Sequence, residues 1–149
     1  MASAGWGMTK QIFGLFVGNT IEETCENRLY EGSYFLSGTV FGFPLRHRFD
    51  ASYTYNKTYP DFTHWCFGWI PELLIGLEPC YFALGVGPYI KSDETPINGG
   101  LFALGFNAAA GLQISRWSVE VYLRHFCNAY TAEPNKGSDF FGVGVGYAF

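Results

Sequence analysis

The alternation of side chains in residues 118–149 constrains the fold more than any other feature of the sequence. Successive side chains of a β-strand point to opposite faces, so residues two apart share a face. In the first half of this stretch Glu120 and Arg124 share one face, opposite Val119 and Val121. In the second half one face is large and apolar and the other is small: Phe141, Val143, Val145, Tyr147 and Phe149 against Gly142, Gly144, Gly146 and Ala148.

The small or polar face of these two strands is typical of the interior of a narrow barrel. The large apolar face is typical of a barrel wall in contact with lipid. A soluble lipocalin-like barrel is the alternative, but there the large residues would fill the interior and polar residues would cover the outside. Glycine on one face and bulky apolar residues on the other, in strand after strand, favour the membrane barrel.

The same period-two pattern predicts eight strands. In the third, Phe49, Tyr53 and Tyr55 face outward, opposite Asp50 and Ser52. In the fourth, the proline at position 71 predicts a bulge or distortion, because proline has no N–H to donate. The predicted strands are 10–19, 32–43, 48–56, 64–77, 80–90, 100–114, 118–129 and 139–149.

The connections between these strands alternate between long and short. The long ones are 20–31, 57–63, 91–99 and 130–138, and the short ones are 44–47, 77–79 and 115–117. Outer-membrane barrels have long outside loops and short periplasmic turns, and an even number of strands closes the sheet without edges. We therefore predict an all-β protein, an eight-stranded antiparallel transmembrane β-barrel in the bacterial outer membrane, with residues 1–149 as one domain and the long loops outside.

Composition excludes several other classes of protein. No run of 18 apolar residues is present, so no transmembrane helix is expected. The net charge of −4 argues against nucleic acid as a partner. The four cysteines form no CxxC motif and no cluster with histidine, so no metal site is predicted. Cys25 and Cys66 both fall near the predicted outer rim, where a disulfide between them is one open possibility.

Three reactive side chains lie on the apolar face of the closing hairpin. His125 and Cys127 are two residues apart on one strand, and Asp139 is near the start of the next. Keeping the apolar faces aligned restricts the hairpin register to every second step, and one allowed register sets Asp139 beside His125. Carboxylate, imidazole and thiol in that order are the orienter, base and nucleophile of acyl-transfer catalysis.

The loop between the two strands adds groups that could bind an oxyanion or a substrate: Asn128, Asn135 and the backbone amide near Gly137. Because all of these lie at the outer rim of the barrel, the expected substrate is a lipid. Each reactive residue also has a purely structural interpretation. A histidine is common at a membrane interface, a cysteine packs as a small hydrophobic residue, and an aspartate often begins a strand after a turn.

Residues 124–129, Arg-His-Phe-Cys-Asn-Ala, and 133–139, Glu-Pro-Asn-Lys-Gly-Ser-Asp, resemble the signature of the lipid A 3-O-deacylase (PagL) family. That signature is His-x-Ser-Asn-Ala, then Pro-Asn-x-Gly, then an acid, then a strand that ends the protein with Phe. The resemblance implies an eight-stranded outer-membrane barrel whose external active site hydrolyses an ester-linked acyl chain of lipid A. It also implies lipid A or lipopolysaccharide and outer-membrane lipids as partners, and no metal or other cofactor.

By this resemblance His125 is the base, Cys127 stands at the nucleophile position and Asp139 orients the imidazole. Asn135 would help to bind the oxyanion, with Asn128 in support. The sequence departs from the family twice, with Cys in place of Ser and Asp in place of the more common Glu. A thiolate beside a histidine is a competent nucleophile. Three functions stay open: a lipid A deacylase, a non-catalytic structural or adhesin-like barrel that has lost its nucleophile, and an acyltransferase.

Overall fold

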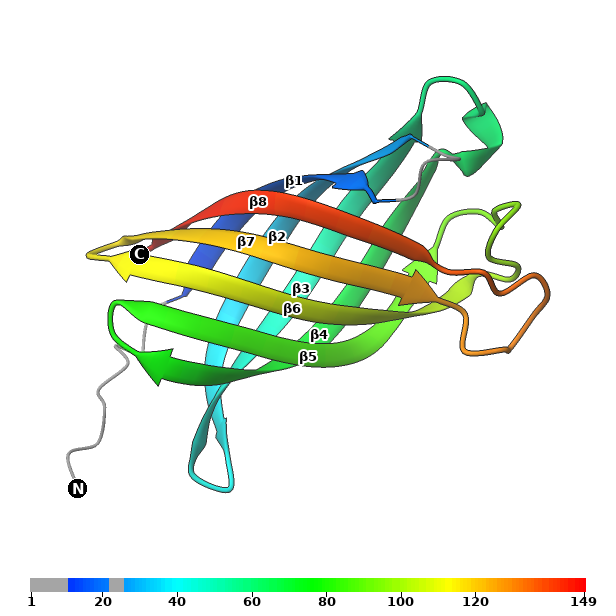
Figure 1. Cartoon of the computed structure of the whole chain (residues 1–149). Helices are drawn as coiled ribbons and strands as arrows, with labels where there is room; N and C mark the ends of the chain where they lie inside the picture. The colour runs from blue at the N-terminus through cyan, green and yellow to red at the C-terminus, as the bar shows by residue number, and fades with distance from the viewer. Residues whose placement is uncertain (1–10, 22–25) are drawn as a thin grey trace.

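A computed structural model of the chain describes residues 11–21 and 26–149, which form one closed antiparallel β-barrel (Figure 1). Each strand pairs with its neighbours in the chain, and β1 pairs with β8. The predicted fold class is therefore confirmed. The strands are β1 (Ile12–Thr20), β2 (Asn27–Val40), β3 (Phe43–Asn56), β4 (His64–Leu77), β5 (Cys80–Lys91), β6 (Phe102–Ile114), β7 (Trp117–Cys127) and β8 (Ser138–Ala148).

The helical content is small. A short 3₁₀ helix, η1 (Pro60–Phe62), lies in the connection between β3 and β4. Within residues 11–21 and 26–149, no helix has the length and apolar character needed to cross a membrane.

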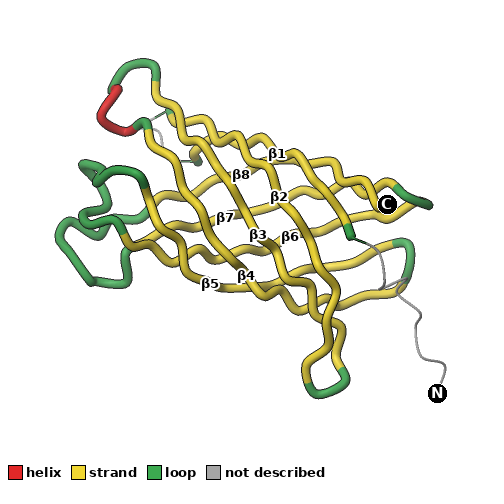
Figure 2. Tube along the Cα trace, turned by 180° about the vertical axis from the view of Figure 1, so that it is seen from behind, coloured by secondary structure: helices red, strands yellow, loops and turns green. Residues whose placement is uncertain are grey.

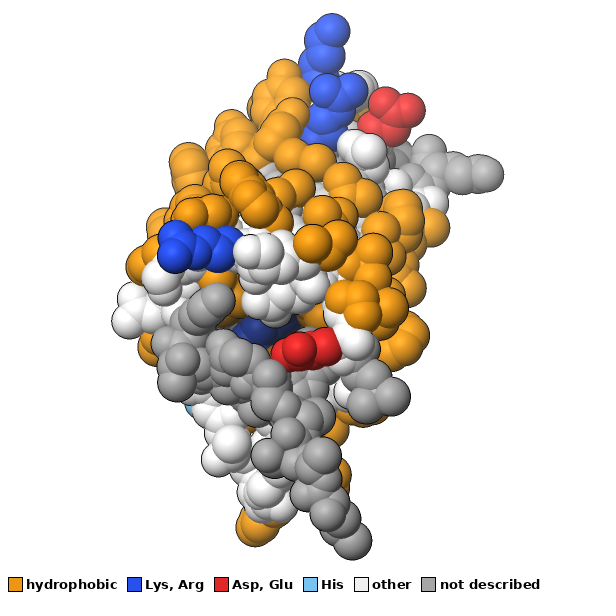
Figure 3. All heavy atoms as spheres, turned by 90° about the vertical axis from the view of Figure 1, so that its left-hand side faces the viewer, with side chains coloured by type: hydrophobic (Ala, Val, Ile, Leu, Met, Phe, Trp, Pro, Cys, Tyr) orange, Lys and Arg blue, Asp and Glu red, His pale blue; other side chains and the backbone are white. Residues whose placement is uncertain are grey.

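Side chains alternate between lumen and exterior along the strands, as the sequence predicted. The large apolar side chains of the outer face are exposed, for example Leu15 at 64% and Phe82 at 59%. The inward face is buried and carries many of the polar and charged side chains. Figure 3, which views the end with the short turns, shows hydrophobic side chains over much of the wall and only a few charged groups. A soluble barrel would show the reverse distribution.

The long connections gather at one end of the barrel and the short turns at the other (Figure 2). The fully described long connections are 57–63, 92–101 and 128–137. The short turns are 41–42, 78–79 and 115–116. We refer to these as the loop end and the turn end.

The predicted hairpin formed by the second and third strands was wrong in its position. Its turn is Phe41–Gly42 rather than 44–47, and the strands pair from Val40↔Phe43 to Asn27↔Asn56. Arg46, which the prediction placed in the turn, lies within β3, and both Arg46 and Arg48 point into the lumen and are buried among carboxylates. A charged side chain that points into the lumen resembles a turn residue in the sequence, so it can mislead the prediction of where a strand ends.

The predicted distortion at Pro71 takes the form of a gap in the ladder between β4 and β5. Pairing is present at Gly68↔Tyr89 and resumes at Glu72↔Gly85. The register is the same on both sides of the gap, so no residue is inserted and there is no bulge. Pairing of β4 with β3 continues through His47↔Pro71. The barrel therefore stays closed around the proline.

The lumen is filled by a network of ion pairs. Three arginines from β3 and β7 meet four carboxylates: Arg46, Arg48 and Arg124 with Glu31, Asp50, Glu72 and Glu120. Arg124 Nη1 lies 2.9 Å from Glu31 Oε2 and 3.2 Å from Asp50 Oδ2. The network links β2, β3, β4 and β7 across the barrel, so it holds opposite walls together.

The glycines of β8 make room for aromatic rings that pack in the lumen beside this network. A Cβ at Gly144 would collide with the ring of Phe16, and one at Gly142 would meet the ring of Tyr122. Phe16 and Tyr122 pack edge to face with ring centroids 5.8 Å apart. The glycine face of the last strand thus reflects a steric requirement of a narrow barrel.

Candidate active site

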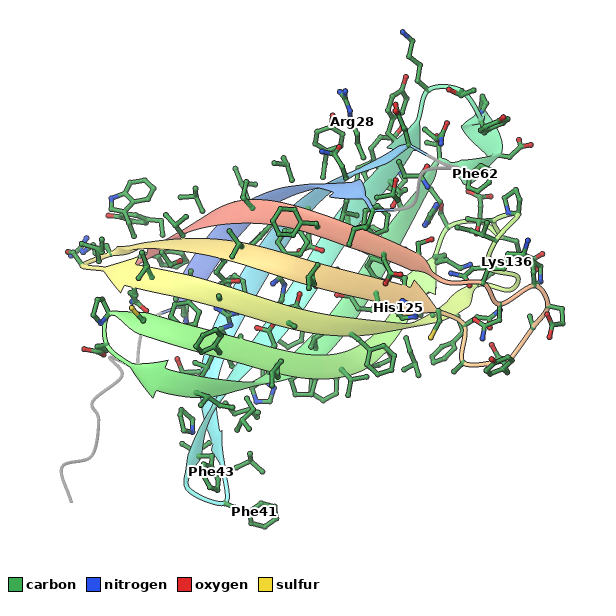
Figure 4. The ribbon with its side chains drawn as sticks, in the orientation of Figure 1. Arg28, Phe41, Phe43, Phe62, His125 and Lys136 are labelled. Carbon is green, nitrogen blue, oxygen red and sulfur yellow. The ribbon has the colours of Figure 1, made fainter. Side chains whose placement is uncertain are left out.

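The ladder between β7 and β8 places His125 directly opposite Asp139. His125 Nδ1 and Asp139 Oδ1 are 2.8 Å apart, a hydrogen-bond distance. Both side chains are on the outer face of the barrel, 38% and 50% exposed. Figure 4 shows His125 on β7 near the loop end. The structure therefore has the one register, among those allowed, that joins the imidazole to the carboxylate.

Cys127 lies two residues further along β7, on the same face as His125. Its thiol is free and half-buried. Among the described residues, no hydrogen bond joins Cys127 to His125. Because Asp139 occupies Nδ1, the Nε2 atom of His125 is the one available to a thiol. The structure thus joins the predicted base to its orienting acid and leaves the predicted nucleophile adjacent but unbonded.

Asn128 organises the loop that follows β7. Its side chain is fully buried, and its Nδ2 donates to the backbone oxygens of Gly99, Ala132 and Pro134 at 2.6–3.0 Å. Its Oδ1 accepts from the Tyr130 N–H at 3.0 Å. A side chain enclosed in this way cannot touch a substrate. The prediction of substrate contact by Asn128 is therefore corrected to support of the loop.

Asn135 differs from Asn128 in keeping part of its side-chain amide available for hydrogen bonding. Its Oδ1 accepts the backbone N–H of Asn128 at 2.9 Å, which fixes the orientation of the amide. Its Nδ2 makes no hydrogen bond to another described residue. The Gly137 N–H, in contrast, donates to Asn98 Oδ1 at 3.3 Å, so this amide is committed within the protein. The predicted use of the Gly137 amide for an oxyanion does not fit that bond.

Gly137 instead shapes the space beside the imidazole. Its φ is +76°, a backbone conformation that favours glycine. A Cβ at this position would lie 2.6 Å from His125 Cε1. The glycine therefore allows the loop to pass directly against the edge of the His125 ring.

Two residues of this site were not predicted from the sequence. Asn98, in the connection between β5 and β6, bonds both Gly137 and the carbonyl of Phe126, and so ties the two long loops together. Phe106, on β6, faces His125 with ring centroids 5.9 Å apart. Pairing of β6 with β7 brings Phe106 beside His125. Folding of the β5–β6 loop against the loop after β7 brings Asn98 beside Gly137.

An open apolar groove runs along the outer wall from the His125–Asp139 pair. Its volume is about 470 Å³. Its outward-facing apolar lining comes from β5, β6, β7 and the residue after β1: Leu84, Phe106, Ala108, Leu123 and Ile21. A groove with an apolar floor and a polar pair at one end fits a hydrocarbon chain attached to a polar ester.

The remaining cysteines lie away from this pair. Cys66 is a buried free thiol and Cys80 is an exposed one at the turn end. Cys25, considered above as a partner for Cys66, lies outside the described residues. Within those residues, no group of three or more His, Cys, Asp or Glu side chains is arranged to hold a metal ion.

Comparison with known families decides what this arrangement belongs to. The model of the lipid A 3-O-deacylase (PagL) family matches residues 37–148, which include the whole closing hairpin. The chain belongs to this family. The predicted resemblance is therefore confirmed, and membership together with the apolar wall makes this PagL-family chain an outer-membrane β-barrel. No curated protein sequence matches it.

Two solved structures share the fold. The crystal structure of the outer membrane enzyme PagL superposes with a TM-score of 0.67 at 18% identity, covering 91% of this chain and 98% of that one. The crystal structure of Neisserial surface protein A (NspA) superposes with a TM-score of 0.59 at 12% identity, covering 94% and 95% of the two chains. At these identities the likeness shows the barrel architecture.

Proposed function

We propose that this protein hydrolyses an ester-linked acyl chain of lipid A in the outer leaflet of the outer membrane. The observation that carries the proposal is the 2.8 Å His125–Asp139 bond on the lipid-facing wall of a PagL-family barrel. A catalytic pair inside the lumen would serve a soluble substrate. A pair on the wall, at the head of an apolar groove, serves a substrate that stays in the membrane.

In the proposed reaction, His125 Nε2 takes the proton of the Cys127 thiol, and Asp139 stabilises the imidazolium that forms. The thiolate attacks the ester carbonyl, and Asn135 Nδ2 donates to the resulting oxyanion. Collapse breaks the C–O bond, and His125 gives its proton to the departing sugar hydroxyl. Water, deprotonated by His125, then cleaves the thioester and releases the fatty acid and the free thiol.

Lipid A in the outer leaflet requires the loop end to face outside the cell, because His125 and Asp139 lie at that end of β7 and β8. The acyl chain would lie along the groove toward the middle of the wall. The polar head of lipid A would meet the loops after β5 and β7.

The decisive experiment incubates the purified barrel with lipid A and measures loss of one hydroxyacyl chain by mass spectrometry. The unaltered protein and Cys127→Ser are compared, since serine is the residue of the family signature. Loss of the chain with either protein, abolished by His125→Ala, supports the proposal. No loss with either, across a range of pH, excludes hydrolysis by this site and favours the non-catalytic barrel.

The covalent intermediate separates hydrolysis through Cys127 from hydrolysis without it. A thiol nucleophile gives a thioester, which neutral hydroxylamine cleaves, whereas Cys127→Ser would give an oxygen ester. Intact-protein mass spectrometry after a short incubation should show an added acyl mass on the unaltered protein. An acyl mass that appears on a lipid acceptor instead of in free fatty acid would assign the site to an acyltransferase.

A further inference from the structure

The three short turns at the turn end differ sharply in composition. The β4–β5 turn carries the exposed residue Glu78, and the β6–β7 turn carries the exposed residue Arg116. The β2–β3 turn carries Phe41 and Gly42 between Val40 and Phe43, and no residue from 36 to 45 is charged. Charged tips suit turns in water. The third turn therefore has a composition suited to another environment.

The backbone of the β2–β3 turn makes the choice of Phe41 costly. Phe41 has φ +48° and Gly42 has φ +81°, the pattern of a two-residue hairpin turn that favours Asn, Asp or Gly at both positions. The Phe41 side chain is 98% exposed, and Phe43 is 62% exposed. Residues held in unfavourable conformations persist where something else stabilises them. Inside the described structure the Phe41 ring has almost no contact, so the stabilising contact is external.

The hairpin also leaves the barrel wall sideways. Among the described residues, β4 pairs with β3 only as far as Leu45↔Leu73, and β1 pairs with β2 only as far as Ile12↔Phe35. The hairpin beyond these pairs projects away from the wall, whereas the other two short turns end close to the barrel (Figures 1 and 2). Phe41 and Phe43 lie at its extremity (Figure 4).

The outer side of this hairpin continues the apolar wall. Phe43 shares the outward face of β3 with Phe49, which is 42% exposed, and Ile75 on β4 is 50% exposed. Since the wall contacts lipid, an apolar extension of the same wall meets the same medium. A surface of this kind in water would be a liability for association.

We propose that residues 40–43 insert into the phospholipid leaflet at the turn end and form a lateral anchor for the barrel. The occupants of this surface are phospholipid acyl chains and glycerol groups, which the rings of Phe41 and Phe43 contact. Burial of these rings offsets the unfavourable backbone at Phe41. The anchor is independent of the catalytic proposal, because it lies at the other end of the barrel from His125.

Electron paramagnetic resonance can measure the depth of the tip in phosphatidylcholine vesicles. In a variant whose four native cysteines are replaced, a nitroxide is attached at Phe41→Cys or, as the control at the same end, at Arg116→Cys. We expect position 41 to be accessible to oxygen and shielded from a water-soluble nickel chelate, and position 116 to show the reverse. Nickel accessibility at position 41 equal to that at 116 would overturn the proposal. So would line broadening that grows with protein density, which indicates a second copy.

A stability comparison tests the anchor without a label. Phe41→Asn and Ser115→Asn both place Asn at a turn position of positive φ, +48° and +59°. Turn preference alone predicts that both substitutions raise the urea midpoint in vesicles. The anchor predicts that Phe41→Asn lowers the midpoint while Ser115→Asn does not. A midpoint for Phe41→Asn equal to or above that of the unaltered protein contradicts the anchor.

Discussion

The imidazole of His125 is held at one nitrogen and open at the other. Asp139 accepts from Nδ1, Phe106 packs against the ring, and Gly137 lies against its Cε1 edge. These contacts fix the ring in one plane before a substrate arrives, which is the role of the orienting acid in acyl-transfer sites. Cys127, the proposed nucleophile, is a free, half-buried thiol with no hydrogen bond to His125. Two of the contacts that hold the His125 ring, those of Asp139 and Gly137, can be tested by substitution.

Asp139→Asn removes the carboxylate that orients and stabilises His125. We expect kcat for lipid A to fall by about 10²–10⁴-fold, the usual contribution of acid–base catalysis, with little change in KM. Asp139→Glu is the matched control, because a carboxylate remains and Glu is the acid of the family signature. Both variants are assayed by release of hydroxy fatty acid. Equal rates for the Asn variant and the unaltered protein would remove Asp139 from the mechanism.

Gly137→Ala tests the space beside the imidazole. The added Cβ would lie 2.6 Å from His125 Cε1, so the ring must move and deacylation should be largely lost. Gly42→Ala is the control, since its φ of +81° is similar to the +76° of Gly137 but nothing lies within 4 Å of its Cβ. Each change costs about 1–2 kcal/mol of backbone strain. If both variants lose stability equally but neither loses activity, Gly137 has only a backbone role.

At the scale of elements, the inward face of β8 is packed closely by side chains in the lumen. Its apolar outer face meets lipid, and its glycines receive the rings of Phe16 and Tyr122. The same strand carries Asp139 at its start. Its register therefore satisfies packing in the lumen as well as the His125–Asp139 hydrogen bond on the wall.

Gly144→Ala should destabilise the barrel, because its Cβ would collide with the ring of Phe16. We expect the free energy of unfolding to fall by about 1–3 kcal/mol, as is usual for overpacking, measured by urea titration in phospholipid vesicles. In a Phe16→Ala background the added cost should be much smaller, since the two positions are coupled. Gly32→Ala is the control, with the nearest atom 3.8 Å from its Cβ. A cost for Gly144→Ala that is unchanged by Phe16→Ala would contradict this packing.

At the scale of the whole molecule, the barrel reverses the distribution of a soluble domain. Charge is inside, in a network of three arginines and four carboxylates, and hydrocarbon is outside. Buried charges are tolerated because each has an opposite charge in contact. Within residues 11–21 and 26–149, the only ion pair on the outer wall is His125–Asp139, where the proposed chemistry takes place.

Arg124→Leu should be among the most damaging substitutions. Arg124 bonds Glu31, Asp50, Tyr89 and Asn107, and its removal leaves buried carboxylates with less compensation. We expect a loss of about 3–5 kcal/mol in the free energy of unfolding. Arg28→Leu is the control, because Arg28 is exposed and projects away from the barrel (Figure 4), and its effect should be within about 0.5 kcal/mol. Equal effects of the two substitutions would show that the lumen network does not stabilise the fold.

The sequence alone predicted the strand number, the closed barrel and the inward and outward faces. These follow from period-two alternation, which is a local property of the chain. It also predicted that His125, Cys127 and Asp139 share the outer face. It failed at the β2–β3 turn, because Arg46, predicted to lie in a turn at 44–47, is a lumen residue of β3 that pairs with Glu72. When the ion-pair partner of a buried charge lies on another strand, the neighbouring sequence does not reveal that the charge is buried.

Tertiary structure decided what local pattern leaves open. The register of β7 against β8 selects the His125–Asp139 pair from several allowed alignments. Phe106 reaches the site because β6 pairs with β7, and Asn98 reaches it because the β5–β6 loop folds against the loop after β7. The hydrogen bond from the Gly137 N–H to Asn98 and the burial of the Asn128 side chain both depend on contact between the β5–β6 and β7–β8 loops. Side-chain direction is set by each strand on its own, whereas contacts between strands are set by the closure of the barrel.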